Sequence, residues 1–503
     1  MSAVSTTISP EIFREYDIRG VAGRDLTDES TRRLGRALGS YFLSHNIKRV
    51  VIGRDNRTSS PMMRNALVDG LTSTGCNVLD IGTVVTPVFY YACILYEAEG
   101  GAMITASHNP PEFNGLKIMR GPSTIYGEEI QKIRRLAEKE SAMYPRSEED
   151  PTRSETFETI GTSEAGKDHP GGEGLATGKS PTPTAKGQVS FGDPKKAYID
   201  MISNKIKLGP RRLKVAVDCG NGTASYFAPE ILEHLGCEVI PLYCESNPNF
   251  PNHFPDPVKP ENLQDLIRLV REKGADVGLS YDGDADRLGV VDEKGNIIWG
   301  DMLMILFWRE ILPKNPGAIA IIEVKCSQAL VEEVERLGGR PMFYKTGHSL
   351  VKAKMREVGA VFTGEMSGHM FFKDEYYGYD DAIYASARLL RILSNTNKSL
   401  SELLADVPHY PATPETRVHC PDREKFKVVE ALREHFRSRY PVIDIDGARV
   451  LFPSGWGLVR ASNTGPELVL RCEAKTPDAL EDIKREMEAA LADFPAVDEV
   501  RWG

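Results

Sequence analysis

The sequence predicts an α/β protein built from several domains, and three observations lead to this prediction. Short apolar β-type runs alternate with longer helix-like stretches along most of the 503 residues. The β-type runs end in Gly-rich or polar turns, as in KVAVDCGNG, ADVGLSYDGD, AIAIIEVKCS and AVFTGEMSG. After two prolines in HYPATPETR (409–417), the pattern changes to a short α+β segment. The alternation is typical of parallel sheets covered by helices, whose ligands gather at the carboxyl ends of strands.

The elements can be placed along the chain from these runs. KRVVIGRD (48–55) is predicted to be a buried strand, and residues 61–74 the helix that follows it. Beyond the two prolines we predict a helix over 422–439, a loop over 458–467 and a final helix over 477–492. At about 100–200 residues per domain, the chain length indicates three to five domains.

One segment does not fit the α/β pattern. Residues 147–190 are rich in Gly, Ser, Thr, Pro and Glu and contain only isolated apolar residues. Such a segment cannot bury enough surface to offset the entropy that is lost on ordering. We therefore predict a low-complexity insertion or linker between two domains.

The composition argues against several classes of protein. The formal net charge is −10, which disfavours nucleic acid or an acidic membrane as a partner. The apolar run Met302–Trp308 is too short to span a bilayer, and the opening MSAVSTTISPEIF lacks the apolar core of a secretory signal. None of the eight cysteines forms a CxxC pair, so we predict reduced cysteines, no zinc site and a cytoplasmic protein. An anionic substrate would need local Arg, Lys and His side chains to overcome the negative charge of the chain.

The loop TASHNP, after the apolar run GGAMI, offers a nucleophile. A serine hydroxyl such as that of Ser107 is a poor nucleophile unless a partner activates it. His108 is adjacent in sequence, although chain neighbours need not point the same way. Taken alone, the motif is also compatible with a polar turn that ends at Pro110 and Pro111.

The loop DGDADR places three carboxylates, those of Asp282, Asp284 and Asp286, at alternate positions. These carboxylates repel one another unless they bend around a hard divalent cation. An EF-hand is a rival interpretation, but Arg287 occupies the position where its sharp turn needs Gly, and the flanking runs are predicted strands. A metal loop with open positions suits Mg²⁺ bound to a phosphate, and an exposed acidic turn is the alternative.

Two further loops suit a phosphorylated sugar. In GEMSGH, Glu365 can accept two hydroxyl hydrogen bonds at once, and Ser367 and His369 can add others. In RASNTGP, which is followed by Arg471, Arg460 can bind a phosphate in bidentate fashion while hydroxyl and N–H groups surround its oxygens. Each loop alone is compatible with an ordinary polar turn. Together, the four loops supply the parts needed for phosphoryl transfer on a sugar.

The sequence resembles the α-D-phosphohexomutase superfamily and, within it, the phosphomannomutase/phosphoglucomutase branch. The resemblance runs from Phe13 to about Ala474, apart from the 147–190 insertion. It is carried, in the family's order, by FREYDIRG (13–20), GRDNR (53–57), TPVFYYA (86–92), TASHNPPEFNGLKI (105–118), VDCGNG (217–222), DGDADR (282–287), EVKCS (323–327), KTGHS (345–349), GEMSGH (364–369) and RASNTGPELVLR (460–471).

The resemblance implies four domains around a central cleft, three similar mixed α/β domains and a smaller C-terminal α+β domain. We predict the following boundaries: 1–146 for domain 1 with the phosphoserine loop, 147–190 for the insertion, 191–299 for domain 2 with the metal loop, 300–411 for domain 3 with the sugar-binding loop, and 412–503 for domain 4 with the phosphate-binding loop.

The resemblance also implies the site residues, position by position. Ser107 would carry the phosphoserine and would bind Mg²⁺ together with Asp282, Asp284 and Asp286. The residues implied for catalysis are Ser107, His108, Lys117, Arg19, Arg287 and His348. Those implied for substrate binding are Tyr16, Lys325, Glu365, Ser367, His369, Arg460, Ser462, Asn463, Thr464 and Arg471.

The activity implied is that of a phosphohexomutase, an isomerase that interconverts hexose 6-phosphate and hexose 1-phosphate through a hexose 1,6-bisphosphate. Lys117 is a candidate base because we expect nearby cations to lower its pKa towards neutrality, and His108, His348 and His369 are rivals. In the family, the Glu that corresponds to Glu365 contacts the 3- and 4-hydroxyls, which mannose and glucose share. Dual mannose/glucose specificity is therefore expected.

Three alternatives remain. Phosphoglucosamine mutase is the nearest, although Met366 matches the mannose/glucose branch better. A metal-dependent sugar phosphatase would need no second phosphate clamp, and a non-catalytic sugar-phosphate sensor would not need both Ser107 and the three aspartates. The expected partners are small-molecule hexose phosphates, and the sequence does not distinguish a monomer from a dimer.

Overall fold

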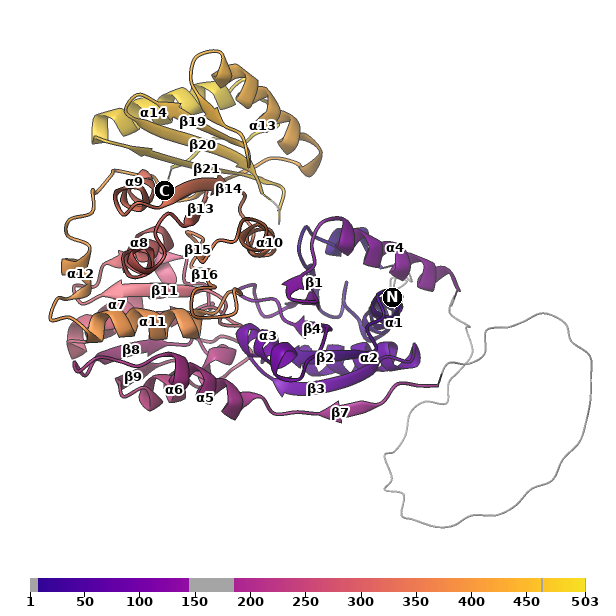
Figure 1. Cartoon of the computed structure of the whole chain (residues 1–503). Helices are drawn as coiled ribbons and strands as arrows, with labels where there is room; N and C mark the ends of the chain where they lie inside the picture. The colour runs from indigo at the N-terminus through magenta and orange to yellow at the C-terminus, as the bar shows by residue number, and fades with distance from the viewer. Residues whose placement is uncertain (1–7, 144–184, 463–464, 503) are drawn as a thin grey trace, which may run out of the picture.

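The computed structural model describes residues 8–143, 185–462 and 465–502, and in these residues the chain forms four sheets with helices packed against them (Figure 1). The predicted insertion at 147–190 lies outside the described residues up to position 184. The predicted C-terminal segment forms a separate unit, as expected.

The first domain is built on a mixed sheet with the strand order β1-β5-β4-β2-β3-β7, to which β6 adds beside β5. Strands β4, β2, β3 and β7 are parallel, whereas β5 is antiparallel to β4 and β1. Its elements are η1 Pro10–Ile12, β1 Ile18–Val21, α1 Asp28–Ser44, β2 Arg49–Arg54, α2 Ser60–Ser73, β3 Asn77–Thr83, α3 Thr86–Leu95, β4 Gly100–Ile104, β5 Phe113–Arg120, β6 Ser123–Thr124, α4 Glu128–Met143 and β7 Val189–Phe191.

The second domain has the strand order β12-β11-β10-β8-β9, in which β10, β8 and β9 are parallel and β11 is antiparallel to its neighbours. Its elements are α5 Lys195–Lys205, β8 Lys214–Asp218, η2 Thr223–Tyr226, α6 Ala228–His234, β9 Glu238–Leu242, η3 Pro260–Leu263, α7 Gln264–Lys273, β10 Val277–Tyr281, β11 Leu288–Asp292 and β12 Ile297–Ile298.

The third domain has the strand order β14-β13-β15-β16, with only β16 antiparallel. Its elements are α8 Gly300–Ile311, η4 Leu312–Lys314, β13 Ile319–Glu323, α9 Gln328–Arg336, β14 Arg340–Tyr344, α10 His348–Val358, β15 Phe362–Gly364, β16 Met370–Phe372, α11 Ala382–Ser394 and α12 Leu400–Leu403.

The fourth domain is a fully antiparallel sheet, β17-β21-β20-β19-β18, with two helices. Its elements are β17 Thr416–His419, α13 Asp422–Arg437, β18 Val442–Ile443, β19 Ala448–Phe452, β20 Gly455–Ala461, β21 Glu467–Ala474 and α14 Pro477–Leu491. The helices predicted over 422–439 and 477–492 are therefore confirmed within two residues at each end.

The first three domains share one topological pattern that positions the site. In each of them, a run of parallel strands is followed by a strand that turns back antiparallel. The loop of this hairpin is TASHNP between β4 and β5, DGDADR between β10 and β11, and EMSGH between β15 and β16. Three of the four predicted site loops thus occupy equivalent positions in three similar sheets.

The cores separate the fourth domain from the others. One cluster of buried apolar side chains includes residues of the first three domains, and a second cluster lies wholly within the first domain. The cluster of the fourth domain contains residues of that domain alone. A small group made of Val324, Trp456 and Leu458 joins the third domain to the fourth. In Figure 1 the fourth domain accordingly lies on the third, at the top of the view, and the first domain lies to the right.

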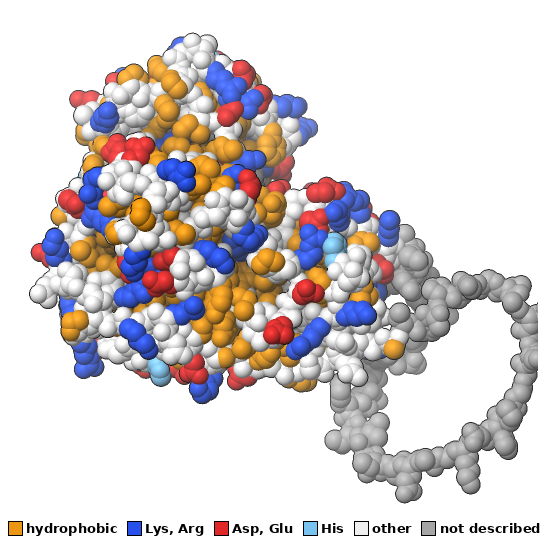
Figure 2. Space-filling view, viewed as in Figure 1, with side chains coloured by type: hydrophobic (Ala, Val, Ile, Leu, Met, Phe, Trp, Pro, Cys, Tyr) orange, Lys and Arg blue, Asp and Glu red, His pale blue; other side chains and the backbone are white. Residues whose placement is uncertain are grey.

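Two expectations from composition can be compared with the structure. All eight cysteines carry free thiols, and seven of them are buried. The helices of the described residues include none that is both long and apolar enough to cross a membrane. Lys, Arg, Asp and Glu side chains are interspersed over the face shown in Figure 2, so the net negative charge is not gathered in one area of that face.

Candidate active site

The four site loops meet at a single cavity of about 1470 Å³, which is lined by residues of all four domains. Every predicted site residue in the described part of the chain lines this cavity, except Asp282 and Asp284. These two are fully buried beside Ser107. Asn463 and Thr464 lie outside the described residues.

Ser107 occupies the loop between β4 and β5 in a left-handed backbone conformation, with φ of 51°. Non-glycine residues rarely adopt this conformation, and it is enriched at functional sites. The Ser107 hydroxyl donates to Asp282 Oδ2 over 2.5 Å and lies 3.0 Å from His108 Nδ1. Burial, followed by the nearby cations Arg287 and Arg19, lowers the pKa of His108 well below its usual value. The ring is therefore neutral and can exchange a proton with the hydroxyl.

A buried arginine holds the Ser107 loop in shape. Arg57, from the motif GRDNR, is 1% exposed and donates to the backbone carbonyls of Ser107 (2.8 Å), Asn109 (2.6 Å) and Pro110 (2.6 Å). The metal loop approaches from the other side, where a Cβ on Gly283 would come within 2.3 Å of the Ser107 carbonyl oxygen. Glycine is therefore required for the close contact between these two loops.

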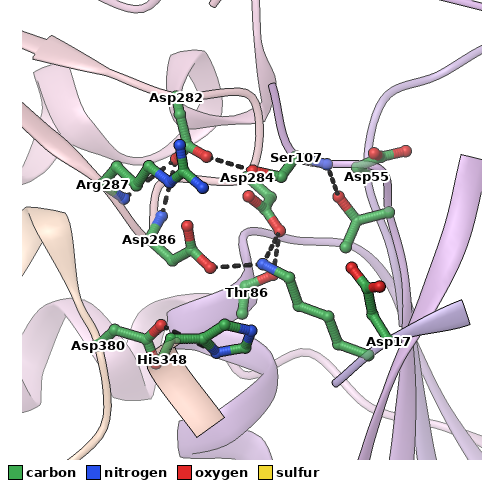
Figure 3. Close-up of polar contacts among 12 residues, drawn as sticks. Asp17, Asp55, Thr86, Ser107, Asp282, Asp284, Asp286, Arg287, His348 and Asp380 are labelled. Carbon is green, nitrogen blue, oxygen red and sulfur yellow. Dashed lines mark hydrogen bonds and ion pairs between the residues drawn. The ribbon is translucent and has the colours of Figure 1, made fainter. Parts of the chain in front are cut away.

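The three aspartates of the metal loop form an acidic triad, Asp282, Asp284 and Asp286, whose oxygens lie within 4.8 Å of one another (Figure 3). All three side chains are buried. Asp284 Oδ1 and Asp286 Oδ1 are buried and have no hydrogen-bond partner among the described residues. Burial, followed by repulsion from Asp286 and Asp284, raises the pKa of Asp282 well above its usual value. Unpaired, buried carboxylate oxygens are the ligands that a hard divalent cation takes, so the triad fits such a cation.

Lys117 differs from its predicted environment. We expected cations around it, but its ammonium donates to Asp284 Oδ2 over 2.7 Å and also to Asp286 Oδ2. Burial lowers the pKa of Lys117, yet the carboxylates of Asp284, Asp286 and Asp282 outweigh burial and raise it. The expected shift towards neutrality is therefore wrong for the protein without a metal ion. The sequence pattern could not reveal this, because the triad reaches Lys117 from another domain.

Two histidines of the third domain share one buried carboxylate. Asp380 Oδ2 lies 3.0 Å from His369 Nδ1 and 3.5 Å from His348 Nδ1, and the two rings stack at 5.5 Å. Asp380 also accepts from Lys352 over 2.8 Å. His369 Nε2 accepts from Arg287 Nε over 3.0 Å, which ties the histidine pair to the metal loop. Asp380 therefore contacts the Nδ1 atom of both rings, and Figure 3 shows it beside His348.

The sugar-binding loop presents a buried carboxylate. Glu365 is 3% exposed, its Oε1 accepts from Gly347 N–H over 2.8 Å, and its Oε2 accepts from Ser367 Oγ over 3.3 Å. Burial raises the pKa of Glu365. Tyr16 enters from the first domain and packs edge-on against His348 at 4.9 Å. This part of the cavity therefore offers acceptors and an aromatic edge to a polyol.

The opposite end of the cavity, defined here as the cationic end, contains Lys325, Arg417, Arg460 and Arg471. Each of these cations contacts a carboxylate. Lys325 Nζ lies 2.7 Å from Glu415, Arg417 Nη1 lies 2.9 Å from Glu467, Arg460 Nε lies 2.9 Å from Asp446, and Arg471 Nη1 lies 3.4 Å from Asp301. Ser462 supports the same loop, since Lys425 donates to its carbonyl oxygen over 2.7 Å.

Arg19 belongs to the Ser107 loop region. Its guanidinium donates to Asn109 Oδ1 over 2.7 Å and to Asp17 Oδ2 over 2.5 Å. The sequence interpretation missed Arg57, Asp380, Arg417 and Glu415. Arg57 was signalled by the motif GRDNR, whereas nothing in the local sequence separates the other three from ordinary surface charges.

Comparison with known proteins bears on all four domains. Four family models match the chain in order: phosphoglucomutase/phosphomannomutase alpha/beta/alpha domain I over 10–143, domain II over 196–295, domain III over 299–410 and the C-terminal domain over 415–490.

Relatives match over nearly the full length. The chain is 44% identical over 484 residues to a phosphomannomutase/phosphoglucomutase of Pseudomonas aeruginosa, covering 96% of each protein. It is 41% identical to a phosphoglucomutase of Neisseria gonorrhoeae, with 97% of this chain and 98% of that protein covered. The crystal structure of a phosphoglucomutase/phosphomannomutase family protein from Burkholderia thailandensis superposes with a TM-score of 0.84 at 39% identity, covering 98% of this chain and 99% of that one.

Proposed function

The chain belongs to the phosphoglucomutase/phosphomannomutase family and is a phosphohexomutase, and from this premise we propose that it interconverts the 6-phosphates and 1-phosphates of mannose and glucose through a phosphoserine at Ser107. The observation that carries this proposal is the position of Ser107. Its hydroxyl donates to Asp282 beside the acidic triad, in the same cavity as the cationic end.

The proposed reaction consists of two phosphoryl transfers. A free hydroxyl of the hexose phosphate attacks the phosphorus on Ser107, so that a P–O bond to the sugar forms while the bond to Ser107 Oγ breaks. The attacking hydroxyl gives its proton to a base of the cleft, and the Ser107 oxygen takes up a proton. The hexose 1,6-bisphosphate then turns around, and Ser107 accepts its other phosphoryl group by the reverse steps. His108 Nδ1 lies 3.0 Å from Ser107 Oγ, which supports a role in moving that proton.

The acidic triad and a phosphoserine oxygen are the groups that would hold Mg²⁺ in this proposal. When bound, Mg²⁺ would offset the charge that develops on the phosphoryl oxygens. Arg287 adds a fixed positive charge beside the triad, because Asp256 and Asp282 outweigh the effect of burial and raise its pKa. Lys117 lies between two of the triad carboxylates and keeps the free protein from holding three uncompensated charges.

Substrate binding is assigned to the middle and the far end of the cavity. Glu365 and Ser367 would accept and donate hydrogen bonds to sugar hydroxyls that mannose and glucose share. Arg460, Arg471, Lys325 and Ser462 would hold the phosphate that is not reacting, with Asn463 and Thr464 proposed beside them. Since the bisphosphate turns around, this end must accept the phosphate on either C1 or C6.

The base that accepts the proton of the attacking hydroxyl is one of four cleft residues, Lys117, His108, His348 or His369. The pKa of His348 is lowered well below its usual value by burial and by the neighbouring Lys352, so its ring is neutral. A neutral imidazole can accept a proton, whereas Lys117 must first lose one of its own.

Intact-mass measurement and peptide mapping of the purified protein test the proposal. We expect one phosphoryl group on Ser107, lost on incubation with hexose 1-phosphate and restored by hexose 1,6-bisphosphate in the presence of Mg²⁺. Ser107→Ala should carry no phosphate and show no mutase activity. The absence of phosphate on Ser107 under both conditions would contradict the phosphoserine cycle. A separate comparison of the rates on mannose 1-phosphate, glucose 1-phosphate and glucosamine 1-phosphate would distinguish dual mannose/glucose specificity from phosphoglucosamine mutase activity.

A further inference from the structure

The loop that carries Lys325 into the cavity is held from the fourth domain. This loop, here called the Lys325 loop, comprises Val324–Cys326 and follows β13 of the third domain. Arg449 Nη1 donates to the carbonyl oxygens of Val324 over 2.7 Å and Cys326 over 2.8 Å. Arg471 Nη1 donates to the carbonyl oxygen between them, that of Lys325. Three consecutive carbonyls of the third domain are therefore bound by two guanidinium groups of the fourth.

Arg449 is unusual among the buried cations of the protein. It lies on β19, is fully buried, and forms no ion pair with any residue in the described ranges. Its guanidinium is sandwiched between the rings of Phe343 and Trp456, whose centroids lie 4.6 Å and 3.7 Å away. Its Nε and Nη2 atoms have no hydrogen-bond partner among the described residues. Burial lowers its pKa to about 9, so it is still protonated at neutral pH.

Burying a cation without a carboxylate partner costs desolvation free energy that no ion pair offsets. An apolar side chain of similar volume would fill the same position without the desolvation cost of a charge. It would, however, leave the carbonyls of Val324 and Cys326 buried without donors. The contacts that only Arg449 supplies are therefore those to the Lys325 loop.

The ammonium of Lys325 is also contacted from the fourth domain. Glu415, which immediately precedes β17, accepts from Lys325 Nζ over 2.7 Å, and Glu323 of the third domain lies 3.2 Å from it. Two further contacts fix the same boundary, since Asp446 accepts from Thr346 N–H over 3.0 Å and Val324 packs with Trp456. Both the backbone and the head group of Lys325 are thus set by the way the fourth domain lies on the third (Figure 1).

We propose that Arg449 is a positioning residue for Lys325: by binding the two carbonyls that flank Lys325, it fixes the direction in which this side chain enters the cavity. The role of Lys325 in binding substrate rests on the function proposed above. Through Arg449, the docking of the fourth domain is coupled to the substrate site of the third. Because Lys325 would contact a bound phosphate in both the ground state and the transition state, its displacement should raise KM and leave kcat nearly unchanged.

The test compares Arg449→Met and Arg449→Lys with a matched control, Arg388→Met. Arg388 is equally buried in the third domain, but it pairs with Glu310 and Asp374 and does not line the cavity. Three quantities are measured: the hydrogen–deuterium exchange of peptides covering 319–329, KM and kcat for glucose 1-phosphate, and the melting temperature.

We expect faster exchange over 324–327 in Arg449→Met and a KM raised about tenfold with kcat within about threefold, because two charge-assisted hydrogen bonds are lost. Arg449→Lys keeps the charge but not the planar fork, so its KM should rise about threefold. Arg388→Met should lower the melting temperature and leave both KM and the exchange over 324–327 unchanged.

Unchanged exchange and KM in folded Arg449→Met would overturn the proposal, as would an equal rise in KM in Arg388→Met. If Arg449→Met does not fold, Arg449→Lys decides, and wild-type exchange and KM in that variant would refute the positioning role. Failure of the proposed function has a different signature. Wild-type protein would then lack mutase activity, while the exchange experiment would still report whether Arg449 holds the Lys325 loop.

Discussion

The two ends of the cavity carry opposite charges and differ in how completely these charges are paired. At the Ser107 end, two of the three carboxylates of the acidic triad, those of Asp284 and Asp286, contact the ammonium of Lys117, and one oxygen of each has no hydrogen-bond partner among the described residues. At the cationic end, Lys325, Arg417, Arg460 and Arg471 each contact a carboxylate. The first end could accept a further cation, whereas at the second an incoming anion would compete with carboxylates that already contact the cations.

This difference predicts that a phosphate at the cationic end, where we propose that it binds, competes with the carboxylates already there. Glu415, which immediately precedes β17, is a carboxylate suited to be displaced, because it is 22% exposed and contacts both Lys325 and Arg417. Glu323 and Asp301, by contrast, are almost fully buried. The net charge of the chain therefore says little about either end, since neighbouring charges set the potential over these short distances.

The largest effect should follow from removing divalent cations, which tests whether the Ser107 end needs a metal ion. With EDTA we expect mutase activity to disappear and to return with Mg²⁺ but not with Na⁺ at matched ionic strength. Because Mg²⁺ binds the folded state, it should also raise the melting temperature, and Asp284→Asn should abolish that rise. Differential scanning fluorimetry and a coupled mutase assay measure both effects. Full activity in EDTA would contradict the prediction that the Ser107 end needs a divalent cation.

A second, smaller effect is expected for Lys117→Ala. Removing the ammonium should lower kcat by about 10²-fold or more, and lower it more than it raises KM, if Lys117 takes part in proton transfer. The half-saturating Mg²⁺ concentration should fall, because Lys117 no longer competes for the carboxylates of Asp284 and Asp286. Steady-state kinetics over a Mg²⁺ series measure both quantities.

Thr86→Val is the control for Lys117→Ala, since Thr86 Oγ1 donates to the same Asp284 oxygen over 2.6 Å without carrying charge. We expect it to change kcat by only a few-fold, because a neutral hydrogen bond contributes about 0.5–1.5 kcal/mol. An unchanged kcat in Lys117→Ala would leave the base among the three histidines.

The smallest effect is expected at the cationic end, where Glu415→Gln removes the carboxylate that contacts Lys325 and Arg417. Competitive inhibition by inorganic phosphate should tighten by about two- to fivefold at low salt and less at high salt, because the pair is partly exposed and screened. Glu467→Gln, which removes only a contact to Arg417, should have a smaller effect. Weaker phosphate inhibition in Glu415→Gln would show that the carboxylate organises the cations instead of competing with the anion.

The carboxylate of Glu415 should stay ionised between pH 6 and 8, so its own titration should not change the effect of Glu415→Gln in this range. Burial raises the pKa of Glu415, but Lys325 and Arg417 outweigh it and hold the pKa below its usual value. Stability from a lowered carboxylate pKa is present above the unfolded value and is lost only as the pH falls through the folded value. Neutral pH therefore lies well inside the range in which the carboxylate is charged.

The sequence predicted those parts of the fold that depend on local pattern. The strand KRVVIGRD, the helix after it and both helices of the fourth domain were confirmed, because apolar periodicity and turn residues define them. The antiparallel strands β5, β11 and β16 could not be recognised from the pattern. A central strand buried on both faces has the same continuous apolar sequence in either direction, as β10 and β11 illustrate.

For the site, the sequence predicted which loops carry the chemistry but not how their charges are paired. Lys117 was expected among cations and lies among carboxylates, because the residues around it come from a loop about 170 positions later. Asp380, Glu415 and Arg449 were missed for the same reason. Each acts on a residue of another loop or domain, and no local spacing signals such a partner.

Strand β7 has a consequence for engineering the protein. Helix α4 and strand β7 both pack in the first domain, against α1 and β3 respectively. The two described elements that flank residues 144–184 therefore both belong to the first domain, so their separation does not depend on where the second domain lies. A fluorescent reporter or an affinity handle inserted between α4 and β7 should thus leave the distances between the catalytic loops unchanged.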